Sequence, residues 1–272
     1  MSILLIILMI PASFDSNSKT SKRKAGTTKA SYKTEVINGF AVKLPSFLTE
    51  GEKDVIRNLL LNMVYVEGGN FTMGQIPDYD PGVIISPRNI HVNSFYIDKY
   101  EVTQSLWWAI MHTNPAKFGS SKNGRFPMEN VSYNDCQMFI NKLNNITGLH
   151  FRLPTAEEWE YAARGGKYSK GYKFSGSNKA ADVAWVGENF RKTTRPVGLK
   201  APNELGLYDM SGNVKEWTSS YFTSNGLTDP NITYKIIRGD CYYDTPRDVL
   251  SGVGWGVNQK SSGVGFRLVL TK

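Results

Sequence analysis

The feature that most constrains the fold of this chain is the point at which its helical periodicity stops. Ahead of Gly166, apolar residues recur at helical spacing, which predicts helices over about 49–63, 103–111, 133–146 and 155–164. After Gly166, glycine, asparagine, serine and aromatic residues dominate, with short apolar bursts such as "KIIRG" and "GFRLVL". We therefore expect an α+β domain that is rich in loops and low in regular secondary structure.

Capping patterns support the boundaries of these helices. Thr49 with Glu52, and Thr155 with Glu158, have the spacing of a capping box, in which each side chain accepts a backbone N–H of the first turn. Gly148 follows the third helical segment, at a position where glycine commonly ends a helix. These local signals predict where the helices begin and end.

The two cysteines, Cys136 and Cys241, are too few for a disulfide scaffold. Cys136 shares one helical face with apolar residues, so we interpret it as a small core residue. The three histidines have no metal-ligand spacing and cannot form a zinc site with these cysteines; they are His91, His112 and His150.

The net charge of +8 is concentrated near the N-terminus. Six lysine and arginine residues lie between Ser16 and Thr34, a stretch without acidic residues, and the rest of the chain carries only +2. This distribution is typical of a solvated linker rather than of a basic binding face. We expect no nucleic-acid partner.

The first residues, "MSILLIILMIPASFD", resemble the core of a signal peptide. The apolar run from Ile3 to Ile10 is too short to span a bilayer as a helix, and Ala12 and Ser13 could form a processing site. A positively charged start is missing, and the alternative is a disordered apolar segment. We expect an exported bacterial protein, in the periplasm or at the cell surface, without a transmembrane span.

These observations divide the chain into four parts. Residues 1–15 form the signal-like or disordered segment, 16–34 the basic linker, 35–62 an N-terminal extension with a short helix, and 63–272 the main domain.

A series of motifs runs in order through the main domain. It includes "VYVEGGNFTMG", "FYIDKYEVTQSLW", "FRLPTAEEWEYAARGG", "LYDMSGNVKEWTSSYF" and "GVGFRLVL". Together they resemble the sulfatase-modifying-factor family, whose type member is the formylglycine-generating enzyme. The resemblance implies a compact, loop-rich domain of the formylglycine-generating-enzyme type, related to the C-type lectin fold.

The loop "DMSGNVKEWT" is a candidate calcium site. Calcium prefers carboxylate and carbonyl oxygens, and Asp209 and Glu216 bracket a glycine-containing turn. The resemblance implies a structural Ca²⁺ bound by the side chains of Asp209 and Glu216 and by the carbonyls of Gly212 and Val214. The alternative is a turn without metal, in which Glu216 accepts backbone amides.

The family's catalytic cysteines are absent from the positions where the resemblance places them. The formylglycine-generating enzyme oxidises a substrate cysteine with copper and oxygen, and two thiolates hold its Cu(I). Aligning the motif on Arg238 and Gly239 puts Asp244 and Val249 at these positions. We therefore predict no bound copper and no catalytic residue. Cys241 is expected to be partly exposed, with a pKa raised by its acidic neighbours.

Three functions remain open for such a chain. The first is a non-catalytic binding or display module for a protein or glycan. The others are an oxidoreductase, of the sulfatase-modifying type or with relocated chemistry, and a structural component of a bacterial envelope or secretion assembly. The first hypothesis places aromatic and polar side chains on one surface: Tyr242, Tyr243, Asp244, Arg247, Asp248, Trp255, Asn258, Gln259 and Lys260. In the alternative, this stretch closes the fold and packs its aromatic rings inward.

Overall fold

A computed structural model of the chain describes residues 32–74, 87–119, 124–187, 193–221, 234–244 and 252–271. The chain divides into two units, Met1–Ala30 and Ser31–Lys272, and all described residues belong to the second. The signal-like segment 1–15 lies outside them. Tyr32, Lys33 and Thr34, which we assigned to the linker, lie in the first strand. Within the described ranges, no helix is long and apolar enough to cross a lipid bilayer.

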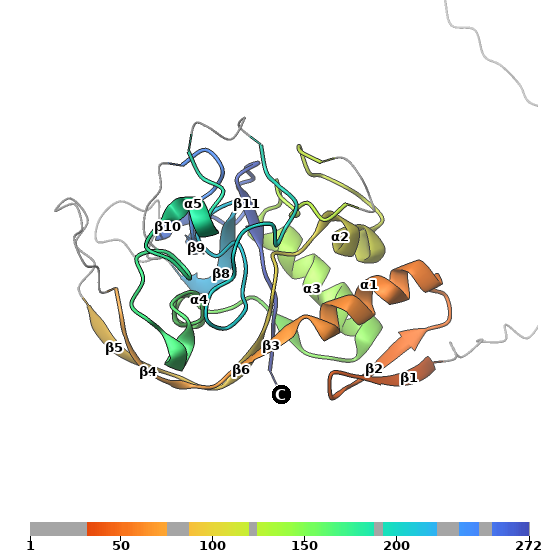
Figure 1. Cartoon of the computed structure of the whole chain (residues 1–272). Coiled ribbons are helices and arrows are strands. Elements are labelled where there is room, and N and C mark those ends of the chain that lie inside the picture. Colours follow the sequence, from red (N-terminus) through yellow and green to blue (C-terminus); the bar gives the residue numbers. More distant parts are fainter. Residues whose placement is uncertain are drawn as a thin grey trace, which may run out of the picture. The chain divides into compact units, whose positions relative to one another are not determined.

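The domain mixes helices and short strands, which confirms the predicted α+β class (Figure 1). The helices are α1 (Glu50–Leu61), α2 (Gln104–Met111), α3 (Tyr133–Thr147), α4 (Ala156–Ala163), the 3₁₀ helix η1 (Gly166–Tyr168) and α5 (Ala180–Val183). The strands are β1 (Tyr32–Ile37), β2 (Phe40–Pro45), β3 (Met63–Val66), β4 (Gly69–Met73), β5 (Arg88–Val92), β6 (Phe95–Asp98), β7 (Phe151–Arg152), β8 (Lys215–Tyr221), β9 (Tyr234–Arg238), β10 (Gly252–Gly256), β11 (Val264–Phe266) and β12 (Val269–Leu270).

The helices begin where the capping patterns predict. Thr49, Ser132 and Thr155 each accept a backbone N–H of the first turn, and the acidic residue three positions later completes the box in all three cases. Gly148 ends α3 in the left-handed conformation, with φ of 70°. Cys136 is fully buried on the inner face of α3, as predicted.

Two four-stranded sheets form the centre of the domain. One has the order β3-β6-β12-β7 and is antiparallel, and the other has the order β10-β9-β8-β11, in which only β11 and β8 run parallel. Two hairpins, β1-β2 and β4-β5, complete the strand pairing. The chain passes from β11 in one sheet to β12 in the other through Arg267 and Leu268, which places Arg267 where the two sheets meet.

The N-terminal extension belongs to the same packed unit as the main domain. Its buried residues Leu44, Ile56 and Leu60 join one apolar cluster with Phe139 of α3 and Phe266 of β11. Figure 1 shows α1, α2 and α3 gathered on one side of the domain, and α1 contacts α2, which in turn contacts α3. The boundary that we drew at residue 63 therefore does not separate two cores.

Two adjacent leucines at the end of α1 test this conclusion. Leu60 is fully buried and Leu61 is 61 % exposed. Leu60→Ala should lower the free energy of unfolding of the whole domain by about 2–5 kcal/mol, because it removes buried atoms and leaves a cavity. Leu61→Ala should change it by less than about 0.5 kcal/mol. Chemical denaturation of both variants measures the difference. Equal effects, or a separate early transition in Leu60→Ala, would show that the extension is not part of the core.

Candidate functional site

The polar centre of the domain is built around Arg267. Its side chain is fully buried, and its Nε and Nη2 donate to the carboxylate of Glu216 at 2.7–3.1 Å. Its Nη1 donates to the carbonyls of Asp98 and Lys99 at 3.1 and 3.0 Å, and its Nη2 also donates to the carbonyl of Tyr208 at 2.9 Å. Arg267 thus ties strand β8 to the turn after β6 and to the loop that precedes the predicted calcium turn.

Both carboxylate oxygens of Glu216 already accept hydrogen bonds, which leaves little room for a metal ion. Besides the bonds from Arg267, its Oε2 accepts a hydrogen bond from Nε1 of the buried Trp159 at 2.7 Å. Three N–H donors thus engage both carboxylate oxygens, since the single N–H of Nε is shared between them, and little acceptor capacity remains. The adjacent guanidinium would also repel a divalent cation. Glu216 is therefore the partner of an arginine and does not fit the role of calcium ligand that we predicted.

Asp209, at the other end of the loop, has a hydrogen-bond partner for only one of its two carboxylate oxygens among the described residues. It adopts the left-handed conformation, with φ of 60°, and its Oδ2 accepts the backbone N–H of Gly198 at 2.7 Å. Its Oδ1 is buried and has no hydrogen-bond partner among the described residues. Burial raises the pKa of Asp209 to about 6. Asp209 has one oxygen available for a cation, in contrast to Glu216.

The four predicted ligands do not fit a calcium site as a set. Gly212 and Val214 could offer only backbone carbonyls, and the described part of the chain contains no group of three or more acidic, cysteine or histidine residues placed to hold a metal. The protein's own groups support the loop instead. The carboxyl group of Glu101 accepts from the backbone N–H of Val214 at 3.2 Å and from Nδ2 of Asn213 at 2.8 Å. Calcium binding stays a prediction that this arrangement does not favour.

Sequence reasoning missed Glu101 and gave no role to Arg267. Both lie inside motifs that carry the family resemblance, "FYIDKYEVTQSLW" and "GVGFRLVL". A charged residue within an apolar run is the one local signal that could have marked them as paired core residues. Burial and the neighbouring carboxylates of Asp209 and Glu216 raise the pKa of Glu101 well above its usual range.

Cys241 is fully buried, so our expectation of partial exposure is wrong. Its thiol donates to Oδ2 of Asp244 at 3.0 Å, and Nζ of Lys215 lies 3.5 Å from the sulfur. The pKa of Cys241 is raised to about 12, mainly by burial and in part by Asp244, while the charge of Lys215 opposes the change. The direction of the predicted shift is confirmed, but burial is its main cause.

Asp244, at the first of the two positions where the family has a copper-binding cysteine, closes a turn. Its carboxylate accepts from the backbone N–H of Cys241 at 2.8 Å and forms an ion pair with Lys215. Burial opposes ionisation, but the hydrogen bonds from Cys241 and Lys215 hold the pKa of Asp244 below its usual value. The second position, Val249, lies outside the described residues.

Apart from Asp244, which is partly buried and paired with Lys215, the residues of the predicted binding surface separate into three groups. Tyr242 is 5 % exposed and packs its ring edge against Phe118, so it does not lie on the surface as predicted. Tyr243 is 47 % exposed. Three polar residues of the same surface are also exposed: Asn258, Gln259 and Lys260. Arg247, Asp248 and the side chain of Trp255 lie outside the described residues, although the backbone of Trp255 belongs to β10.

Comparison with known proteins assigns the family. The model of the sulfatase-modifying factor enzyme 1-like domain matches residues 52–272. The chain therefore belongs to this family, as the motifs indicated.

Three relatives show the range of proteins that this chain resembles. It is 32 % identical to the chaperone protein LppX of Paenibacillus barcinonensis, over 65 % of this chain and 77 % of the relative. It is 26 % identical to the formylglycine-generating enzyme of Thermomonospora curvata, over 67 % and 78 %. It is 34 % identical to the inactive C-alpha-formylglycine-generating enzyme 2 of Bos taurus, over 52 % and 48 %, so it spans about half of that protein.

Solved structures confirm the predicted fold type. Treponema denticola variable protein 1 has a TM-score of 0.67 and 25 % identity, over 89 % of this chain and 99 % of that one. CarF has a TM-score of 0.65 and 27 % identity, over 78 % and 98 %.

Replacement of Glu216 tests the assignment of its partner. Glu216→Gln should lower the free energy of unfolding by about 3–5 kcal/mol, because it leaves the buried guanidinium of Arg267 without its counter-charge. The loss should be the same in calcium and in a chelator. The control Glu50→Gln removes a carboxylate whose side chain is 72 % exposed and should change stability little. A loss that appears only in the presence of calcium would restore Glu216 as a metal ligand.

Proposed function

We propose that this chain is a non-catalytic member of its family that acts as a binding module. The observation that carries the proposal is the environment of Asp244. Copper(I) is held by soft thiolates, whereas Asp244 presents a hard carboxylate that is already paired with Lys215 and Cys241. The nearby thiol of Cys241 is buried, and its raised pKa keeps it protonated near neutral pH.

The relatives support a role without the family's oxidation chemistry. One of them is described as an inactive enzyme and another as a chaperone protein. The scaffold therefore serves proteins that are not described as active formylglycine-generating enzymes. By analogy, we infer that this chain has the fold of the family and binds a ligand through its surface.

The binding surface that we propose is the exposed part of the predicted set. Tyr243 supplies a rigid aromatic contact, and Asn258, Gln259 and Lys260 supply polar ones, a combination that is common in protein-binding loops. The ligand class that fits is a protein or glycan. The signal-like pattern of residues 1–15 supports export to the periplasm or cell surface, which is part of this proposal.

The absence of copper chemistry can be tested directly. The full chain is incubated with Cu(I), oxygen and a peptide that carries a sulfatase-type cysteine motif, with an active formylglycine-generating enzyme as positive control. Mass spectrometry should find no conversion of the cysteine to formylglycine. The double variant Asp244→Cys, Val249→Cys should gain Cu(I) binding, because it restores two thiolates. Conversion by the wild type that disappears in Cys241→Ser would overturn the proposal.

The proposed surface can be tested with two neighbouring tyrosines. Tyr243→Ala should weaken binding to a hit from an array of defined glycans and peptides by about 1–2 kcal/mol, because an exposed ring is available as an anchor. Its melting temperature should stay nearly unchanged. Tyr242→Ala is the control and should lower the melting temperature, because this ring is buried. The surface is wrongly placed if Tyr243→Ala keeps full affinity or loses as much stability as Tyr242→Ala.

A further inference from the structure

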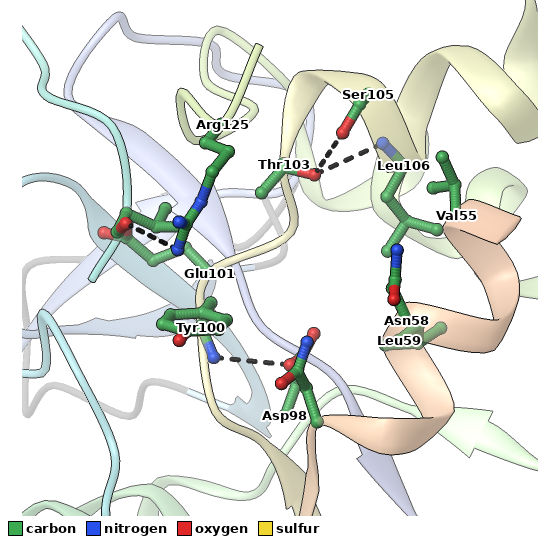
Figure 2. A pocket seen from close by; sticks show the side chains of 12 residues that line it. Val55, Asn58, Leu59, Asp98, Tyr100, Glu101, Thr103, Ser105, Leu106 and Arg125 are labelled. Atoms are coloured by element: carbon green, nitrogen blue, oxygen red, sulfur yellow. Dashed lines mark hydrogen bonds between the residues drawn. The ribbon is translucent and has the colours of Figure 1, made fainter. Parts of the chain in front are cut away.

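A cavity of about 340 Å³ lies away from the surface discussed above, between the extension and the main domain (Figure 2). Its walls come from α1, from the turn after β6, from the start of α2 and from the segments that contain Arg125 and Val197. None of its lining residues belongs to the predicted binding surface or to the copper positions. The cavity therefore provides a separate site whose chemistry can be derived from its own residues.

One end of the cavity carries a fixed positive charge. The guanidinium of Arg125 lies 5.5 Å from the centre of the Tyr100 ring, and its Nη2 donates to the carbonyl of Val197 at 3.2 Å. Gly198 allows this packing, because a Cβ atom there would lie 2.5 Å from the Tyr100 ring. Within the described part of the chain, Arg125 has no carboxylate oxygen within 4.0 Å, although its charge acts on the buried carboxyl group of Asp209 and lowers the pKa of that group. Its remaining N–H groups can therefore bind an anion, and a carboxylate matches their geometry best.

The other end carries a buried carboxyl group to which no side chain of the described residues donates a hydrogen bond. Asp98 is 4 % exposed, and its Oδ1 accepts the backbone N–H of Tyr100 at 3.3 Å. The backbone N–H of Lys99 also favours the ionised form of this carboxyl group. The neighbouring Arg267 donates to Glu216 and to backbone carbonyls, including that of Asp98 itself. Burial raises the pKa of Asp98 to about 7, which shows how little the protein stabilises its ionised form.

The remaining walls are suited to a small, partly apolar molecule. Val55 and Leu59 of α1 and Leu106 of α2 form an apolar side, and Asn58 adds an amide on this side (Figure 2). The volume corresponds to roughly eleven water molecules at about 30 Å³ each. This space suits a compound with about the number of non-hydrogen atoms of an amino acid.

We propose that this cavity binds a small amino-carboxylate with an apolar body, such as a free aliphatic α-amino acid. The carboxylate pairs with Arg125, the ammonium group donates to Asp98, and the apolar side chain packs against Leu59 and Leu106. The ligand adds a charged donor to the backbone N–H groups that Asp98 already has, and it places an anion in direct contact with Arg125. Glu101 also lines the cavity, but both of its oxygens accept from the 209–216 loop, so it takes no part in binding.

Calorimetry and thermal unfolding of the full chain with each of the twenty free amino acids test the proposal. At least one apolar amino acid should bind and raise the melting temperature. Arg125→Gln and Asp98→Asn should each weaken its binding at least about tenfold, because each removes one partner of a charge pair. Arg88→Gln, at an exposed arginine of β5, is the control and should not change it.

Modified ligands assign the two ends. The carboxamide of the bound amino acid, which lacks the carboxylate, should bind the wild type more weakly than the free amino acid does. Its affinity should not fall further in Arg125→Gln. The N-acetyl derivative, which lacks the ammonium group, should bind the wild type more weakly than the free amino acid does. Its affinity should not fall further in Asp98→Asn. If Asp98→Asn does not fold, Asn58→Phe fills the cavity from the exposed side of α1 and should abolish binding.

The proposal is overturned if no amino acid binds, or if binding is unchanged in Arg125→Gln and in Asn58→Phe. Stabilisation by calcium alone that Asp98→Asn removes would assign the acidic end to a metal ion and would also overturn it. These outcomes are independent of the proposed binding surface, because that surface is tested through Tyr243.

Discussion

The ion pair between Arg267 and Glu216 is the interaction on which the rest of the domain depends. Both side chains are almost fully buried, and the five N–H donors of an arginine can be satisfied only if several segments meet around it. Here these segments are strand β8, the turn after β6 and the Tyr208 loop. A buried pair is costly to desolvate, and removing one partner is costlier still. The two sheets are thus joined where β11 passes into β12.

The same centre contains more carboxyl groups than cations. Asp98, Glu101 and Asp209 lie near Glu216, and burial raises the pKa of all three. Neutral hydrogen-bond donors stabilise two of these carboxyl groups. Glu101 accepts a backbone N–H of the 209–216 loop, and Asp209 accepts the backbone N–H of Gly198. These hydrogen bonds support the 209–216 loop with groups of the protein itself. Asp98 lines the cavity and, unlike Glu101, accepts no hydrogen bond from a side chain of the described residues, which is why we propose that a ligand's ammonium group binds there.

The turn that contains Cys241 and Asp244, where the motif resemblance places the first copper-binding cysteine, is held together by polar and ionic contacts. Asp244 accepts hydrogen bonds from the thiol and the backbone N–H of Cys241 and forms an ion pair with Lys215. The carboxylate, the thiol and the ammonium group are therefore engaged with one another. A buried thiol with a strongly raised pKa is a poor nucleophile and a poor metal ligand.

The sequence by itself determined the family, the α+β class and the approximate boundaries of the four longer helices, because capping boxes, helical periodicity and short motifs are local signals. It also placed Cys136 in the core, since the apolar face of α3 is visible at a spacing of three and four residues. Only the tertiary structure decided the partner of Glu216, which lies 51 residues away in the chain. It likewise decided that Tyr242 is buried against Phe118 and that the extension shares the main core. These outcomes depend on contacts between distant segments, and local sequence cannot specify which of two similar side chains, such as Tyr242 and Tyr243, turns toward the interior.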